Sequence, residues 1–200
     1  ITATEITKIK KNAKIFVIGE IGLREELKKM GHVIYTNPKD YRNIDFVIVG
    51  LDRDFKYENL AIAQKCIMEG KANFYATNTD ATLPAARGFL PGAGVMVRAL
   101  ETCTSTKPIK IFGKPQPYGI ELIMKNVNIP ANRSCIFGDR LETDILAGNR
   151  AGILSIAVLT GVVSREYIKN LRIKSKERED FDKNLLPDVT INKLDDIFKK

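Results

Sequence analysis

The 200-residue chain has few of the residues on which several common kinds of site depend. Its one histidine, His32, follows Gly31 and precedes an apolar pair, and we expect a structural role because no partner motif accompanies it. Catalysis by a Ser-His-Asp or Cys-His arrangement is therefore not supported. The three cysteines, Cys66, Cys103 and Cys135, are scattered, and their spacing fits no metal site.

The sequence also lacks a signal peptide and a run of apolar residues long enough to cross a membrane. The longest mostly apolar run, residues 152–163, is about 12 residues, whereas a spanning helix needs about 20. The odd number of cysteines and the placement of Cys135 in an apolar run favour a reducing compartment. We therefore expect a cytoplasmic protein without a membrane partner.

Charge of one sign is not concentrated anywhere in the chain, although its net charge is +8. The densest charged run, residues 169–183, mixes lysines and arginines with aspartates and glutamates. No basic stripe interleaved with aromatic residues is present, so we do not expect a nucleic-acid partner. The part of this run at residues 172–184 is interpreted as a solvated loop insertion.

What the chain does contain is a regular alternation of apolar strands and amphipathic helices, which predicts an α/β fold with a largely parallel sheet. A linker at residues 104–108 divides the chain, and we place the strand 109–112 in the second part. The predicted strands are 14–19, 32–35, 45–50, 73–77, 109–112, 134–137, 154–159 and 188–191. The predicted helices are 20–31, 57–70, 95–103, 118–127, 142–151, 165–171 and 193–198.

Candidate catalytic side chains follow two of these strands. Asp139 comes directly after the strand 134–137, Asp144 opens the next helix, and Lys114 follows the strand 109–112. Ligands of open α/β sheets bind at the carboxyl edge, so a lysine and an acidic pair at neighbouring strand ends predict a site for phosphate and Mg²⁺. The two acids converge only if Asp139 lies on the loop and Asp144 in the first helical turn. The alternative is that both acids cap a helix N-terminus and that Lys114 is an ordinary surface lysine.

These motifs resemble the third and fourth motifs of the haloacid dehalogenase superfamily, in the branch of para-nitrophenylphosphatases, phosphoglycolate phosphatases and pyridoxal phosphatases. The resemblance covers nearly the whole chain and implies a partial Rossmann-like core with an inserted α/β cap domain. It implies a remnant of the core at residues 1–12, the cap at 13–106 and the C-terminal part of the catalytic core at 107–200. The matching segments are 16–23, 47–53, 76–80, 91–94, 113–115, 138–144 and 159–162.

The resemblance also implies roles. Asp139 coordinates Mg²⁺, Asp144 supports the metal site, and Lys114 stabilises a phospho-aspartyl intermediate and orients the nucleophile. The family's first motif, with its nucleophilic aspartate, and its second motif do not occur here, so we expect both upstream of Ile1 and expect this fragment to be inactive alone. The implied activity is Mg²⁺-dependent hydrolysis of small phosphate monoesters, such as para-nitrophenyl phosphate and 2-phosphoglycolate.

The loop at residues 77–84 resembles the substrate-specificity loop of the cap. Asn78 and Asp80 are its candidate substrate-binding residues, although both residue types also suit turn formation. Leu83 favours the phosphoglycolate type, because pyridoxal phosphatases carry a histidine at the matching place. Relatives in this branch often dimerise through the cap, so a homodimer is a further expectation.

Two segments resemble functional motifs only in part, and two alternative functions stay open. Asp52-Arg53-Asp54 follows an apolar run and mimics the first motif, but Phe55 stands where a glycine would let the backbone approach a ligand. The glycines at residues 92 and 94 are interpreted as a tight turn rather than a phosphate cradle. The alternatives to a phosphatase are a catalytically inactive relative that binds a phosphorylated ligand or a protein partner, and a flavodoxin-like binding module. The paired acids disfavour the latter, because they would repel phosphate.

Overall fold

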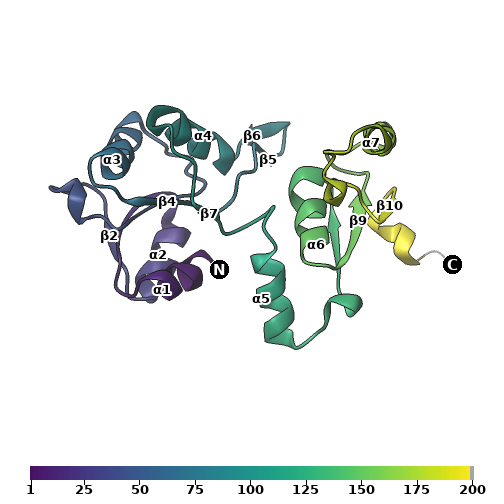
Figure 1. Cartoon of the computed structure of the whole chain (residues 1–200), viewed down its shortest axis with the longest axis horizontal. Helices are drawn as coiled ribbons and strands as arrows, with labels where there is room; N and C mark the ends of the chain where they lie inside the picture. The colour runs from purple at the N-terminus through teal and green to yellow at the C-terminus, as the bar shows by residue number, and fades with distance from the viewer. Residues whose placement is uncertain (199–200) are drawn as a thin grey trace. The chain divides into compact units, whose positions relative to one another are not determined.

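The computed structural model describes residues 1–198, and the chain forms two compact units, Ile1–Gly113 (unit 1) and Lys114–Lys200 (unit 2) (Figure 1). Both units alternate parallel strands with helices, which confirms the predicted α/β class. Across residues 1–198, no helix combines the length and the apolar character that crossing a membrane requires.

Unit 1 is built on a five-stranded parallel sheet in the order β2-β1-β3-β4-β7. After β1 the chain forms β2 at one edge of the sheet, and the next strand, β3, lies on the opposite side of β1 within the strand order. The order therefore reverses at β1, and a topological switch point lies between β1 and β3. The strands are β1 (Lys14–Ile18), β2 (Val33–Tyr35), β3 (Phe46–Val49), β4 (Asn73–Ala76) and β7 (Lys110–Ile111). The helices are α1 (Thr2–Ile9), α2 (Ile21–Lys29), α3 (Tyr57–Met68) and α4 (Ala93–Thr104).

Both faces of this sheet are covered, because alternate residues of each strand point to opposite sides. Phe16 and Ile18 pack in a core with α3 and α4, whereas Ile15 and Val17 pack in a second core with α1 and α2. Figure 1 shows these helix pairs on the two faces. Burial on both faces explains why the strands are continuous apolar runs rather than alternating ones.

His32 is buried between α1 and β1, as its expected structural role requires. Its Nδ1 accepts a hydrogen bond from the Ala13 N–H at 3.1 Å, and its Nε2 lies 2.9 Å from the Thr7 hydroxyl. The Thr7 hydroxyl donates to the Ala3 carbonyl, so it accepts from His32 Nε2–H. These partners fix a neutral imidazole, and burial lowers the pKa of His32 below its ordinary value.

The predicted boundary at residue 106 is wrong as a division between compact units. Strand β7 pairs with β4, and just beyond it the Phe112 ring stacks on Tyr75 with centroids 5.4 Å apart. Lys110 also forms a 3.0 Å ion pair with Glu5, and Ile6 of α1 is fully buried in the same unit. Residues 1–12 and 107–113 therefore belong to unit 1. The assignment of the units to a cap and a catalytic core stays a prediction.

A two-stranded antiparallel hairpin, β5 (Thr82–Pro84) and β6 (Phe89–Pro91), lies in the segment expected to be a loop. Its strands are short and each ends in proline, which cannot donate to a strand ladder. This composition concealed the hairpin in the sequence.

Unit 2 contains a three-stranded parallel sheet in the order β10-β9-β8. Helix α7 continues to Glu177, so the first half of the run interpreted as a loop insertion is helical, and residues 194–198 form a 3₁₀ turn instead of the predicted α-helix. The elements are α5 (Tyr118–Val127), β8 (Cys135–Gly138), α6 (Leu146–Arg150), β9 (Leu154–Val158), α7 (Arg165–Glu177) and β10 (Val189–Ile191).

One side of unit 2 is open. Within residues 1–198, β8 pairs only with β9, and its outer edge has no strand partner. Cys135 and Phe137 of β8 are exposed, and α5 buries none of its side chains although it carries Ile123 and Val127. An unpaired strand edge beside exposed apolar side chains is typical of a surface that another segment covers.

Candidate active site

Asp139 lies at the carboxyl end of β8, where the chain turns toward α6. Its Oδ2 accepts a hydrogen bond from the Val162 N–H at 3.0 Å, and its carbonyl accepts from the Val163 N–H at the same distance. Because β8 and β9 are parallel neighbours, their carboxyl ends meet, and the loop after β9 reaches Asp139. The Val162 N–H thus orients the carboxylate, and the Val163 N–H holds the Asp139 main chain.

Asp144 lies in a π-helical turn, Leu141–Ile145, that precedes α6. In this turn the Arg140 carbonyl accepts from both the Asp144 and the Ile145 N–H, at 2.9 and 3.2 Å. The Asp144 side chain is only 12% exposed. Its Oδ1 accepts from Lys114 Nζ at 2.7 Å and its Oδ2 from the Arg140 N–H at 3.3 Å. Asp139 lies on the loop and Asp144 in the first turn, which is the arrangement that convergence of the two acids would require, and π-turns often occur at functional sites.

Two glycines leave the space that the acids occupy. A Cβ built on Gly138 would lie 2.1 Å from the Asp144 Cβ, and one on Gly161 would lie 2.0 Å from the Asp139 Oδ2. Both distances are far below van der Waals contact, so any larger residue would displace a carboxylate. Glycine is therefore required at both strand ends for steric reasons.

Lys114 is the first residue of unit 2, and its amine reaches Asp144 across the turn. The expectation that the lysine and the acids follow neighbouring strands is wrong, because β7 lies in the sheet of unit 1 and not beside β8. The side-chain contact forms nevertheless. The following residue, Pro115, is joined through a cis peptide bond, and its carbonyl accepts from Arg150 Nη1 at 3.3 Å.

The donor set of this group fits part of a magnesium site. Asp139 Oδ1 has no hydrogen-bond partner among the described residues, whereas both oxygens of Asp144 are engaged. Mg²⁺ typically takes one or two protein carboxylates together with water and substrate phosphate. In the described part of the chain no group of three or more His, Cys, Asp or Glu side chains could hold a metal. Of these two acids only Asp139 has an oxygen that could take a cation, because Lys114 and the Arg140 N–H occupy both oxygens of Asp144.

The three predicted substrate-binding residues lie in unit 1 and form a local group after β4. Asn78 Nδ2 donates to Asp80 Oδ2 at 2.9 Å, and the Gly94 N–H donates to the Asp80 carbonyl at the same distance. Asp80 Oδ1 is buried and has no hydrogen-bond partner among the described residues. Leu83 is half-buried in β5 and pairs with Leu90 of β6. The polar pair thus has the turn-forming bonds of the alternative interpretation and, in addition, one buried acceptor that is not satisfied.

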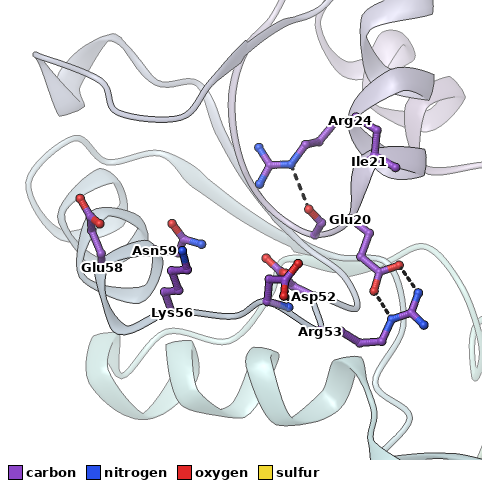
Figure 2. A pocket seen from close by; sticks show the side chains of 10 residues that line it. Glu20, Ile21, Arg24, Asp52, Arg53, Lys56, Glu58 and Asn59 are labelled. Carbon is purple, nitrogen blue, oxygen red and sulfur yellow. Dashed lines mark hydrogen bonds and ion pairs between the residues drawn. The ribbon is translucent and has the colours of Figure 1, made fainter.

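A separate cavity of about 670 Å³ lies in unit 1 at the switch point between β1 and β3 (Figure 2). Arg24 donates to the Gly19 carbonyl at 2.9 Å. Figure 2 shows Arg53 paired with Glu20 through two hydrogen bonds. Asp52, which mimics the first motif in the sequence, lines this cavity and is 7% exposed. Crevices at such switch points are the usual ligand sites of open α/β sheets.

The surroundings of Asp52 do not support a nucleophile. Its Oδ1 accepts from the Asp54 N–H at 3.1 Å, as in an ordinary turn, and no ion pair involves Asp52 among the described residues. The cavity is lined by four carboxylates and three cations, and both of its arginines are already hydrogen-bonded. Lys114 and Asp139, by contrast, belong to unit 2.

The sequence prediction missed the backbone N–H of Val162 and the side chains of Glu142 and Tyr167, which lie beside Asp139. A backbone donor has no residue-type signature. The available signal was Gly161 after the next parallel strand, because the carboxyl ends of neighbouring strands lie together.

Comparison with known proteins connects this geometry to one family. Residues 111–186 match the model of the HAD-hydrolase-like family. A 5'-nucleotidase, YutF, of Bacillus subtilis is 37% identical over 167 residues, which are 84% of this chain and 62% of the relative. An acid sugar phosphatase of Staphylococcus haemolyticus is 34% identical over 168 residues, again 84% of this chain and 62% of the relative. The chain therefore spans less than two thirds of the length of these curated relatives.

Solved structures agree. A p-nitrophenyl phosphatase from Archaeoglobus fulgidus superposes with a TM-score of 0.77 at 32% identity, covering 98% of this chain and 70% of that one. A 4-nitrophenylphosphatase from Thermotoga maritima superposes with a TM-score of 0.81 at 34% identity, covering 100% of this chain and 69% of that one.

Proposed function

The chain belongs to the haloacid dehalogenase-like hydrolase family, and on that premise we propose that the protein containing it is a Mg²⁺-dependent phosphatase of small phosphate monoesters. One observation carries the proposal: Lys114 Nζ is held 2.7 Å from the buried Asp144, and Asp139, on the loop that leads into the same helical turn, has one carboxylate oxygen without a hydrogen-bond partner among the described residues. A fixed cation beside a metal-binding carboxylate suits a phosphoryl group, whose transfer depends mainly on positioning and charge stabilisation.

In this proposal each residue has a distinct part. Bound Mg²⁺ would neutralise charge on the phosphoryl oxygens, and Asp139 is its ligand from unit 2. Asp144 holds the Lys114 ammonium in place, and Lys114 offsets the negative charge of the transferring group. The nucleophile is an aspartate outside residues 1–198. It attacks phosphorus while the ester P–O bond breaks, and the leaving oxygen takes up a proton from solvent; water then hydrolyses the phospho-aspartate, which releases phosphate and restores the carboxylate.

The open side of unit 2 supports a nucleophile located elsewhere in the protein. The unpaired edge of β8 can accept one more parallel strand, and the exposed apolar residues of β8 and α5 can pack against it. A strand added at this edge would end beside Asp139, since carboxyl ends of parallel strands share one edge. An aspartate there would face both the metal ligand and Lys114.

Unit 1 is assigned to the cap and to substrate selection. Asn78, Asp80 and Leu83 are the proposed substrate-binding residues, and the unsatisfied Asp80 Oδ1 is an acceptor for a substrate hydroxyl. The candidate substrates are para-nitrophenyl phosphate and 2-phosphoglycolate, together with the nucleotides and sugar phosphates that the names of the relatives indicate. The three cysteines are free, in keeping with the proposed cytoplasmic location. A homodimer through unit 1 completes the proposal.

The test is hydrolysis of para-nitrophenyl phosphate with and without Mg²⁺. We expect no turnover by the 200-residue chain, and turnover by a longer chain that includes the native upstream segment. In the longer chain, Asp139→Asn should abolish most activity and weaken Mg²⁺ binding, whereas Asp195→Asn, a surface change of the same charge, should not.

Three results would contradict parts of this proposal. Full activity of Asp139→Asn at ordinary Mg²⁺ would remove the metal assignment. Turnover by the 200-residue chain that is lost in Asp52→Asn would make Asp52 the nucleophile. Binding of phosphate monoesters without any turnover by the longer chain would favour the catalytically inactive relative.

A further inference from the structure

A cavity of about 380 Å³ in unit 2 lies beside the proposed metal ligand. Asp139 and Glu142 both contribute to its wall, and Tyr167 of α7 lies at the same cavity. A water molecule occupies about 30 Å³ of liquid volume, so the cavity can hold several. Its charged lining consists of two carboxylates and the guanidinium of Arg140, which leaves an excess of negative charge.

Glu142 is held in this wall by Tyr167. The Tyr167 hydroxyl donates to Glu142 Oε1 at 3.1 Å, although 25 residues separate them in sequence. Burial and then the Glu142 charge raise the pKa of Tyr167, so its phenol stays a donor at neutral pH. The other oxygen, Glu142 Oε2, has no hydrogen-bond partner among the described residues.

The support for Tyr167 continues into the loop that holds Asp139. Ser164 caps α7 by accepting from the Tyr167 N–H at 3.1 Å, and two residues earlier Val162 donates to the Asp139 carboxylate. The Tyr167 side chain is 47% exposed, so its bond to Glu142 adds little to stability. What the bond provides is a fixed orientation of the Glu142 carboxylate relative to the loop at Asp139.

We propose that Glu142, oriented by Tyr167, accepts hydrogen bonds from water molecules of the cation bound at Asp139. The inference rests on the proposed function, because it requires Mg²⁺ at Asp139. Mg²⁺ sheds its water reluctantly and keeps several molecules when it binds to proteins. Water molecules of the cation that lie on the cavity side of Asp139 can donate hydrogen bonds to Glu142, because its Oε2 has no partner among the described residues. Glu142 is thus a water-mediated cation-binding residue, and Tyr167 is its positioning residue.

The test is a Mg²⁺ titration of the longer chain that includes the native upstream segment, followed by NMR, with the amide signals of Val162 and Val163 as local reporters. Both amides donate to Asp139, so a cation at this carboxylate shifts them. We expect Glu142→Gln to raise the Kd for Mg²⁺ about tenfold, within the range for residues that act through metal ligands. Tyr167→Phe, which removes one hydrogen bond, should raise it about threefold.

The matched control is Glu166→Gln. Glu166 is an exposed acid in the first turn of α7, it does not line the cavity, and its variant loses the same charge. A comparison of Mg²⁺ with Ca²⁺ distinguishes binding of the cation's water molecules by Glu142 from a general electrostatic attraction of its charge. Ca²⁺ accepts more protein oxygens and dehydrates more readily than Mg²⁺. Glu142→Gln should therefore weaken Mg²⁺ binding more than Ca²⁺ binding, and its melting temperature should match that of the wild type.

Equal Kd values for Glu142→Gln and Glu166→Gln, with binding still lost in Asp139→Asn, would overturn this inference and leave the metal assignment intact. Equal weakening of Mg²⁺ and Ca²⁺ would also overturn it. No saturable shift in the wild type, or an unchanged Kd in Asp139→Asn, would overturn the metal assignment and the inference together.

Discussion

Replacing Gly161 with alanine tests whether the loop after β9 controls the Asp139 carboxylate. The added Cβ would lie 2.0 Å from Asp139 Oδ2 and 2.4 Å from its Cβ, whereas real Cβ contacts essentially never fall below 3.0 Å. The carboxylate or the loop must therefore move by about 1 Å. Such a shift removes the Val162 bond to a charged acceptor and overpacks the strand end, and these overlapping effects predict a loss of about 2 kcal/mol in unfolding free energy.

The assay is urea unfolding of the 200-residue chain, followed by NMR signals from unit 2. In the longer chain, a displacement of about 1 Å at the site should lower kcat/KM for para-nitrophenyl phosphate about 100-fold. Gly22→Ala is the control, because a Cβ there meets nothing within 4 Å and Gly22 lies in α2, where alanine favours the helix by up to about 1 kcal/mol. An unchanged unfolding free energy and unshifted Val162 amide in Gly161→Ala would refute the reasoning.

Two further predictions concern a titrating core residue and the lysine of the site. Burial holds the pKa of His32 below the unfolded value of about 6.5, so the unfolded chain takes up a proton first as pH falls. The unfolding free energy should be level above about pH 7 and should drop as the pH falls from about 6.5 toward the folded pKa of His32. This drop should be absent in His32→Asn. If the drop persists in that variant, His32 is not its cause. Lys114→Met should lower the unfolding free energy of unit 2 by about 3 kcal/mol, because it leaves the nearly buried Asp144 carboxylate without its cation, and it should abolish turnover in the longer chain; a variant with normal turnover would exclude a catalytic role for Lys114.

Patterns within one element were predictable because the physical cause is local. The strand predicted at 45–50 forms as β3, with all four residues buried, since a continuous apolar run fits a sheet covered on both faces. The helix predicted at 57–70 forms as α3 with Ala63 and Ile67 buried, as the spacing of its apolar residues requires. The placement of Asp139 and Asp144 followed in the same way from their five-residue spacing around a helix start.

Pairings between elements were not predictable, because they depend on contacts that leave no local pattern. The strand at residues 109–112 was recognised, but its sheet is decided by Phe112 packing on Tyr75 and by the pairing of β7 with β4. The hydrogen bond from Val162 to Asp139 likewise depends on the chain returning parallel to β8 at β9. Residue types were enough to predict which side chains the site contains, whereas the contacts among them depend on how the strands pair.

The contacts of Asp144 specify how it would support the metal site, which is the role that the resemblance implies. A side chain that is only 12% exposed carries a stable charge only when that charge is compensated, and here Lys114 and the Arg140 N–H use both oxygens. Direct coordination of Mg²⁺ by Asp144 would break one of these bonds and release Lys114 from its position. Asp139, with one free oxygen and its other oxygen fixed by Val162, can bind a cation without that cost. Under the proposed function, Asp139 would therefore bind the metal and Asp144 would hold the lysine.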